Sequence, residues 1–131
     1  MIVDTSAICA ILFAEPDAGR YIEAIAAAPE ARISAVTLVE ATTVIEGRRT
    51  GTAPTPTPID RWVAGLGAEI CPVTERTARL AQEGWRRFGK GRHPAKLNLG
   101  DCFAYALAIE RDEPLLFKGD DFAQTDVKRA L

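Results

Sequence analysis

Short apolar runs and longer amphipathic segments follow one another along the chain, which is the pattern of strands alternating with helices. The chain opens on two branched apolar residues, Ile2-Val3, followed by Asp4 and two hydroxyl residues, as in a buried strand that ends in a turn. A later run contains Pro72, so that strand is expected to be short or to lie at an edge of the sheet. The segments expected to be strands are residues 1–3, 32–34, 68–73 and 114–117, and a last short strand is possible around Val127.

Helices are expected between these strands, and capping residues mark several of their ends. Thr57 and Thr74 are suited to the N-cap position, while Gly89 fits the end of a helix. The segments 7–14 and 102–109 carry no charge and are apolar all round, so both are expected to be buried helices. The six expected helices are residues 7–14, 16–28, 35–49, 58–66, 75–88 and 102–109.

Spacings of three and four residues identify the helix faces that are expected to pack on the core. Glu40 lies nearly opposite the core face of its helix, with Val36 and Val44 one turn to either side. It is the only charge between Arg32 and Glu46. A lone carboxylate flanked by valines indicates that this side of the helix is covered too, with Glu40 partly buried. The expected core residues are Ile22, Ile25, Ala26, Leu38, Ala41, Thr42, Ile45, Ala78, Ala81, Trp85 and Phe88.

Strands alternating with helices predict an α/β fold in which a mostly parallel sheet is covered by helices on both faces. A chain of 131 residues is expected to form a single domain, residues 1–131. The segment 51–58 alternates prolines with threonines and is expected to be a loop or extended spacer. It is not expected to be a domain boundary, because the part on either side is too small for a good core.

The composition, with 47% apolar and 26% charged residues, is that of an ordinary soluble globular protein. No apolar stretch is long enough to cross a bilayer and no secretory signal is visible, so the cytoplasm is the expected location. The three cysteines are odd in number, lie far apart and form no CxxC pair, so each is expected to be a small buried hydrophobe. They are Cys9, Cys71 and Cys102.

Basic residues are concentrated in one segment of a chain whose net charge is only −2. Residues 86–96 hold five of the 16 lysines and arginines, together with His93 and no acid. Such a segment on an otherwise acidic protein predicts contact with an anionic partner. The alternative, common for an isolated run of charge, is a solvated loop.

Acidic residues stand next to strongly apolar segments at four places. Asp4 follows the first strand, Asp101 opens the charge-free helix, and Glu40 lies on the helix after the second strand. Asp120 and Asp121 follow the last apolar strand. Because right-handed crossovers bring the carboxyl ends of parallel strands to one edge, these acids are expected to lie close together. Each also has a structural alternative, as a helix cap, a turn residue or half of an ion pair.

A cluster of buried acids is usually stabilised by a divalent cation, because like charges repel and each is costly to desolvate. The single histidine, His93, excludes a histidine-rich zinc site, so oxygen ligands point to Mg²⁺ or Mn²⁺. Such a site suits metal-assisted hydrolysis of phosphodiesters, and the basic segment would hold a nucleic-acid backbone.

Four motifs occur in a characteristic order and spacing: Met1-Ile2-Val3-Asp4-Thr5-Ser6, the step from strand to helix between Ser34 and Glu40, Leu99-Gly100-Asp101-Cys102, and Phe117-Lys118-Gly119-Asp120-Asp121-Phe122 followed by Thr125-Asp126. On these motifs the chain resembles, over nearly its whole length, the PIN-domain ribonucleases, specifically the VapC toxins of bacterial type II toxin–antitoxin pairs.

The resemblance implies a three-layer α/β/α sandwich and a Mg²⁺- or Mn²⁺-dependent endoribonuclease. By the resemblance, Asp4 and Asp101 are the main metal ligands, and Glu40 orients or activates the water. Asp121 is favoured over Asp120 as the fourth acid, because the family's acid most often directly precedes the phenylalanine. The implied catalytic and metal-binding residues are Asp4, Glu40, Asp101 and Asp121, with support from Thr5, Ser6 and Asp120.

The resemblance also implies partners, namely a cognate antitoxin, an RNA substrate and a second copy of the chain in a homodimer. Lys90, Arg92 and Lys96 are predicted to contact RNA phosphates. His93 is better suited to a phosphate or partner contact than to the role of general acid.

Two other functions are alternatives to the nuclease. A signalling phosphoacceptor domain also binds Mg²⁺ with acids at a sheet edge, but it needs paired acids after the first strand and an acceptor Asp after the third. Here Thr5 follows Asp4, and the third strand ends at Val73-Thr74. A catalytically inactive binding module with the same fold is disfavoured, because the set of four acids is intact.

Overall fold

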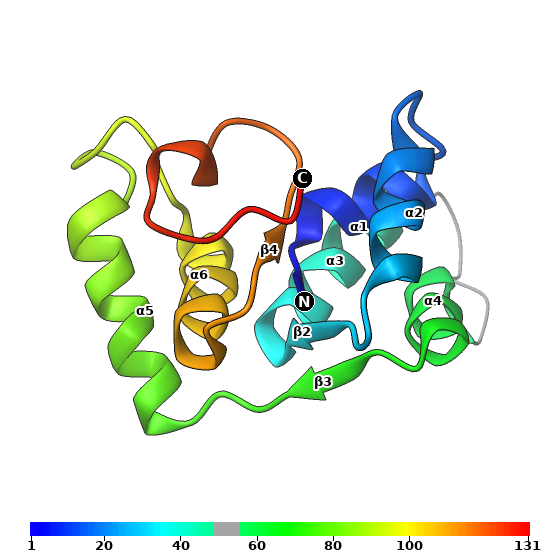
Figure 1. Ribbon diagram of the computed structural model, residues 1–131, viewed down its shortest axis with the longest axis horizontal. Helices are drawn as coiled ribbons and strands as arrows, with labels where there is room; N and C mark the ends of the chain where they lie inside the picture. The colour runs from blue at the N-terminus through cyan, green and yellow to red at the C-terminus, as the bar shows by residue number, and fades with distance from the viewer. Residues whose placement is uncertain (49–55) are drawn as a thin grey trace.

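The computed structural model describes residues 1–48 and 56–131, which form a sheet flanked by helices (Figure 1). The strands of this described part are β1 (Ile2–Val3), β2 (Arg32–Ser34), β3 (Glu69–Cys71) and β4 (Leu115–Leu116). Its helices are α1 (Thr5–Leu12), α2 (Ala18–Ala27), α3 (Ala35–Gly47), α4 (Pro58–Leu66), α5 (Glu75–Phe88) and α6 (Leu99–Arg111), with a 3-10 turn η1 (Phe122–Gln124). None of the helices in these two stretches is long and apolar enough to span a membrane.

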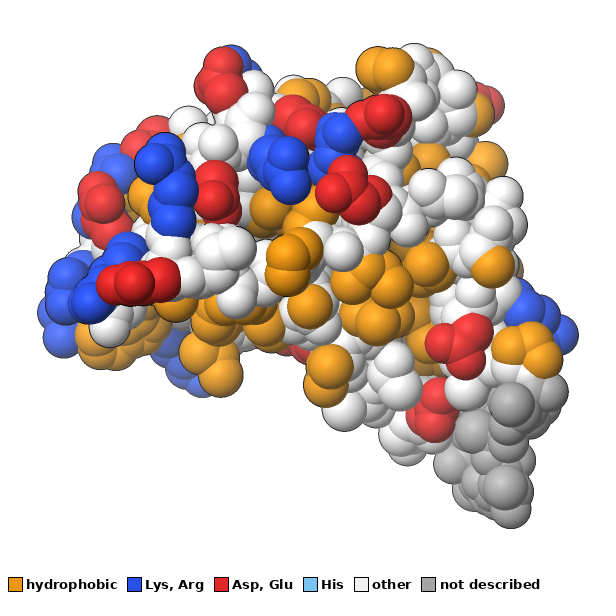
Figure 2. Space-filling view, turned by 90° about the horizontal axis from the view of Figure 1, so that it is seen from below, with side chains coloured by type: hydrophobic (Ala, Val, Ile, Leu, Met, Phe, Trp, Pro, Cys, Tyr) orange, Lys and Arg blue, Asp and Glu red, His pale blue; other side chains and the backbone are white. Residues whose placement is uncertain are grey.

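The four strands run parallel in the order β3-β2-β1-β4, which confirms the predicted parallel sheet. β1 lies in the interior of the sheet, where Ile2 pairs with Arg32 on one side and Leu115 on the other. β3 forms an edge, as expected from Pro72, which follows it. Ile70 in this edge strand is 43% exposed. Figure 2, seen from below, shows apolar side chains exposed among charges of both signs.

Alternate residues of the strands face opposite helical layers, as the pleat of a strand requires. Ile2 and Leu115 belong to the core formed with α5 and α6. Val3, Ile33 and Leu116 belong to the core formed with α1, α2, α3 and α4. The structure is therefore a three-layer α/β/α sandwich, as the resemblance implied, and both faces of the sheet are covered.

The predicted strands and helices are present, but several ends differ. α1 begins at Thr5, earlier than expected, because the side chain of Asp4 caps it. The end of the predicted helix 35–49 and most of the segment 51–58 lie outside the described residues.

Two predicted core faces are partly wrong. α2 packs through Tyr21 and Ile25, whereas Ile22 is 52% exposed and Ala26 is exposed too. Trp85 of α5 is 42% exposed rather than buried. The helix instead packs against α6 at Gly84, where an added Cβ would meet the ring of Tyr105. The buried residues of α5 are Thr77, Ala81, Gly84 and Phe88.

The remaining core predictions hold to different degrees. In α3, Ala41 and Ile45 are buried as expected, while Leu38 and Thr42 are half-buried. Cys71 and Cys102 are buried, and Cys9 is half-buried. The last strand expected near Val127 is reduced to an isolated bridge between Leu115 and Arg129.

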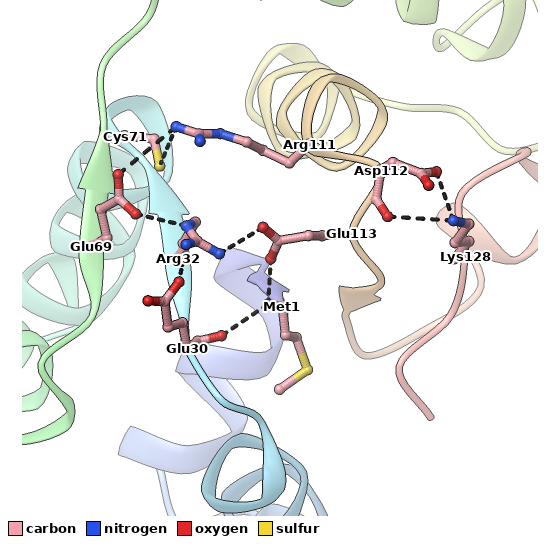
Figure 3. Close-up of polar contacts among 9 residues, drawn as sticks. All are labelled: Met1, Glu30, Arg32, Glu69, Cys71, Arg111, Asp112, Glu113 and Lys128. Carbon is pink, nitrogen blue, oxygen red and sulfur yellow. Dashed lines mark hydrogen bonds and ion pairs between the residues drawn. The ribbon is translucent and has the colours of Figure 1, made fainter.

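An ion-pair network joins the segments that lead into the strands at the amino edge of the sheet (Figure 3). The Arg32 guanidinium on β2 donates to Glu69 on β3 at 2.6 Å and to Glu113, which precedes β4, also at 2.6 Å. It also pairs with Glu30. The amino group of Met1 donates to the other oxygen of Glu113 at 2.5 Å. With the Arg111 guanidinium 3.8 Å from Glu69, three positive and three negative groups balance one another at this edge.

We expect Arg32→Ala to lower the free energy of unfolding by about 1–3 kcal/mol, because it leaves the half-buried Glu113 without its guanidinium partner. The matched control is Arg79→Ala, which removes an exposed i,i+4 pair with Glu75 and should cost no more than about 0.5 kcal/mol. Urea denaturation at neutral pH measures both. Equal losses for the two variants would contradict a stabilising role for the network.

Candidate functional site

The candidate site lies at the carboxyl edge of the sheet, opposite the ion-pair network. Asp4 directly follows β1, and its backbone N–H donates to the Leu116 carbonyl of β4 at 2.9 Å. The chain crosses from β1 to β2 on one side, while β4 lies on the other. In parallel α/β sheets, the crevice at such a reversal of strand order is where ligands bind.

Asp4 is only 2% exposed, and its two carboxylate oxygens differ in their hydrogen bonding. Its Oδ2 caps α1 by accepting from the backbone N–H of Ser6 at 2.9 Å and from the Ser6 hydroxyl at 2.5 Å. Its Oδ1 is buried and has no hydrogen-bond partner within the described residues. Burial, reinforced by the charge of Glu40, raises the pKa of Asp4. The helix cap foreseen as a structural alternative is therefore real, yet it occupies only one oxygen.

Asp101 is held by a capping box at the start of α6. Its Oδ2 accepts from the backbone N–H of Asn98 at 2.7 Å, and Asn98 Oδ1 accepts from the backbone N–H of Asp101 at 3.0 Å. This cap explains why α6 begins at Leu99, before the charge-free segment. Asp101 is thereby fixed in the first turn of the helix with an exposure of 8%.

The neighbouring acids affect the pKa of Asp101. Its pKa is raised to about 7, mainly by burial, and the charges of Asp4, Glu40 and Asp121 contribute in the same direction. These acids come from β1, α3 and the segment after β4, so the structure brings together the groups that the sequence predicted to converge. Asp120 is exposed and is not among the charges that act on Asp101.

Two hydroxyls support the acids. Thr5 Oγ1 donates to Glu40 Oε2 at 2.5 Å and so joins the first turn of α1 to α3. Ser6 Oγ, which donates to Asp4, in turn accepts from the backbone N–H of Lys118 at 3.0 Å. The Lys118 ammonium donates to Glu15 at 2.5 Å and to Asp17 at 2.6 Å, and not to the clustered acids. These contacts agree with the supporting role expected for the hydroxyls.

The donor set fits a hard divalent cation. Carboxylate and hydroxyl oxygens are what Mg²⁺ and Mn²⁺ prefer, and the orphaned Oδ1 of Asp4 is a buried acceptor that a cation would satisfy. In residues 1–48 and 56–131, no three acid, histidine or cysteine side chains lie close enough together to form a ligand cage for a metal ion. Mg²⁺ takes few protein ligands and keeps several waters, so it does not need such a cage.

The basic segment is an ordered loop between α5 and α6. The backbone N–H of Lys90 donates to the Leu97 carbonyl at 3.0 Å, and the N–H of Leu97 returns a bond to Phe88. The guanidinium of Arg92 lies 4.1 Å from the centre of the Trp85 ring. The side chains of Lys90, Arg92 and Lys96 are exposed.

His93 has a structural use in this loop. Its Nδ1 accepts from the backbone N–H of Ala95 at 3.1 Å, and its ring packs edge-on against Phe88. These contacts fix the orientation of the ring within the loop.

Sequence reasoning missed Asn98 and the backbone of Lys118 as supports of the acids. The first could have been found, because Asn98 and Asp101 have the three-residue spacing of a capping box. The second could not, since a backbone N–H donor leaves no trace in the residue type.

Comparison with known proteins places these features in a family. The sequence profile of the PIN domain matches residues 1–128. Ribonuclease VapC28 of Mycobacterium tuberculosis is 48% identical over 132 residues, which cover 100% of this chain and 98% of the relative. Ribonuclease VapC of Mycolicibacterium smegmatis is 43% identical over 127 residues and 97% of each chain.

Solved structures share the fold. VapC20 of Mycobacterium tuberculosis, described as a toxin that cleaves the sarcin–ricin loop, superposes with a TM-score of 0.70 at 17% identity, over 96% of this chain and 95% of that one. A chain of a toxin–antitoxin complex from Klebsiella pneumoniae gives a TM-score of 0.69 at 20% identity, covering 95% and 92%. At these identities the likeness shows the fold alone.

The raised pKa of Asp101 predicts that stability falls with rising pH when no metal is present. Between its ordinary value and about 7, the folded chain binds more protons at Asp101 than the unfolded chain does. The free energy of unfolding should therefore decrease as pH rises through this window. Asp101→Asn keeps an oxygen that can accept from Asn98 but loses the charge, so it should be the more stable protein at pH 8, by about 1–3 kcal/mol.

Urea denaturation in EDTA between pH 4 and pH 8 tests this expectation. The matched control is Asp120→Asn, because Asp120 is exposed and does not act on Asp101. Parallel pH profiles for wild type and Asp101→Asn would show that the buried carboxyl is not the cause.

Proposed function

The chain belongs to the PIN domain family, and from that premise we propose that it is a metal-dependent endoribonuclease that acts as the toxin of a type II toxin–antitoxin pair. The carrying observation is the cluster of carboxylates at the carboxyl edge of the sheet, of which Asp4 and Asp101 are buried, Glu40 is half-buried and Asp121 is exposed. Burial and the neighbouring acids raise the pKa of Asp101 to about 7. The proposal is supported by relatives that are 41–48% identical over almost the whole chain and are named VapC ribonucleases.

Four carboxylates are suited to hold Mg²⁺ or Mn²⁺, namely Asp4, Glu40, Asp101 and Asp121. When bound, the metal would lower the pKa of a water and stabilise charge on the scissile phosphate. Asp4 Oδ1 is free to bind because the cap of α1 uses only Oδ2. Asp101 has the same division, since Asn98 engages only its Oδ2.

The remaining residues of the site orient these acids. Ser6 holds one Asp4 oxygen, and the Lys118 backbone holds Ser6. Thr5 fixes the carboxylate of Glu40, which is thereby placed to orient the attacking water. Asp120 would have at most a supporting role, as a second acid beside Asp121 in the turn after β4. Preorganisation of this kind keeps the reacting groups in place without rearrangement during the reaction.

The partners proposed are RNA, a cognate antitoxin and a second copy of the chain. The exposed side chains of Lys90, Arg92 and Lys96 would bind RNA phosphates, with His93 beside them. The structural neighbour from a toxin–antitoxin complex supports the antitoxin. An RNA-cleaving toxin of this kind would act in the cytoplasm.

We expect Asp4→Asn and Asp101→Asn each to lower RNA cleavage by about 100-fold or more in Mg²⁺ and to abolish growth inhibition. Asparagine can still cap each helix, so the folded structure is retained while the ligand charge is lost. The control is Asp120→Asn, expected to keep most of the activity. Cleavage at wild-type rates by either of the first two variants, once shown to be folded, would rule out the assigned site.

Neutralising the basic loop should weaken RNA binding for all sequences alike. The triple substitution of Lys90, Arg92 and Lys96 by Gln is expected to reduce the slope of log K against log salt by about 2, at about 0.7 per lost single-strand phosphate contact. Lys128→Gln, which removes a base paired with Asp112, is the control and should leave the slope unchanged. An unaltered slope in the triple variant would mean that the loop does not contact RNA.

A further inference from the structure

Gly100 lies against the carboxylate of Glu40. It is a buried residue in the first turn of α6, between the exposed Leu99 and the acid Asp101. A Cβ built on Gly100 would overlap both oxygens and the carboxyl carbon of Glu40. Apart from the chain neighbours of Gly100 and the backbone of its own helix, these are the three nearest atoms to that position in the described residues. The Glu40 carboxylate therefore lies where the side chain of residue 100 would otherwise be.

The overlap involves the far end of a flexible side chain and not a backbone. An alanine at position 100 can therefore be accommodated by the fold if the Glu40 carboxylate moves away. Alanine also favours a helix over glycine, so the start of α6 should not weaken. A side chain at residue 100 would therefore move the Glu40 carboxylate and have a smaller effect on the stability of the chain.

A second contact holds Glu40 from another direction. Thr5, at the start of α1, donates its hydroxyl to Glu40 Oε2 at 2.5 Å. Glu40 itself extends from α3, so its carboxylate is confined by the first turns of two other helices. The amino ends of helices carry a partial positive charge, which favours a carboxylate at both contacts.

We propose that Gly100 is a positioning residue. Because it has no side chain, the Glu40 carboxylate can lie against Thr5 and beside Asp101. The inference rests on the proposed function for its catalytic meaning, since Glu40 is there one of the metal-site acids. The geometric part stands independently of it, because it concerns only where one carboxylate lies.

The first experiment compares Gly100→Ala with Gly65→Ala. Gly65 is also helical, in α4, and a Cβ added there meets no described atom within 4 Å. Both variants should melt within a few degrees of wild type. We expect Gly100→Ala alone to weaken Mn²⁺ binding, measured by calorimetry without RNA, by at least about 10-fold. It should lower RNA cleavage at least as much. Wild-type Mn²⁺ affinity in Gly100→Ala would overturn the proposal.

A double-mutant cycle with Glu40→Ala separates positioning from a direct effect on α6. Without the Glu40 carboxylate, the three atoms that the added methyl group would overlap are gone. Gly100→Ala should then have no further effect on the Mn²⁺ affinity of the Glu40→Ala protein. An equal loss in both backgrounds would show that the substitution acts through the helix and not through Glu40.

The crystal structure of Gly100→Ala gives a readout that does not depend on nuclease activity. The distance from Thr5 Oγ1 to Glu40 Oε2 is expected to increase beyond hydrogen-bond range. If that contact is unchanged, the proposal is wrong, whether or not the chain cleaves RNA. If the contact is lost but wild type cuts no RNA, the proposed function fails and the positioning of Glu40 by Gly100 stands.

Discussion

The burial of like charges at one edge of a parallel sheet is the constraint on which the rest of the structure depends. Asp4 and Asp101 are 2% and 8% exposed, and burial is the main reason that the pKa of each is raised. Within the described residues, neither forms an ion pair with a basic side chain. Such an arrangement is costly unless hydrogen bonds hold the carboxylates and a counter-charge comes from outside the chain. That imbalance supports the proposed binding of a cation.

In the described part of the chain, charged groups are paired at one edge of the sheet and unpaired at the other. At the amino edge, the three carboxylates of Glu30, Glu69 and Glu113 are balanced by three positive groups, which are the guanidiniums of Arg32 and Arg111 and the amino group of Met1 (Figure 3). At the carboxyl edge the acids gather without a basic partner among the described residues. A stabilising network and a functional cluster are distinguished here by compensation, and not by the number of charged residues. This contrast supports placing the chemistry beside Asp4.

The parallel sheet and the gathering of acids at one edge could be predicted from the sequence, because they follow from short-range pattern and from crossover handedness. β1 with Asp4 at its end is the clearest case. The buried faces of helices were less predictable. Trp85 has the right spacing for the core, yet Gly84 brings α6 so close that the helix packs through Gly84 instead. The approach of Gly100 to Glu40 joins residues far apart in the chain, and no local pattern contains it.

The site and the helix caps are made by the same carboxylates, and the division of oxygens makes this compatible with stability. Asp4 caps α1 with Oδ2, Asp101 closes the capping box of α6 by accepting from Asn98 on Oδ2, and Glu40 accepts from the Thr5 hydroxyl on Oε2. Each acid thus spends one oxygen on holding its own orientation and retains the other. The helix caps are needed for the fold in any case, so the acids are oriented before any ligand arrives. Placing ligands at helix starts therefore gives a rigid site without additional supporting structure.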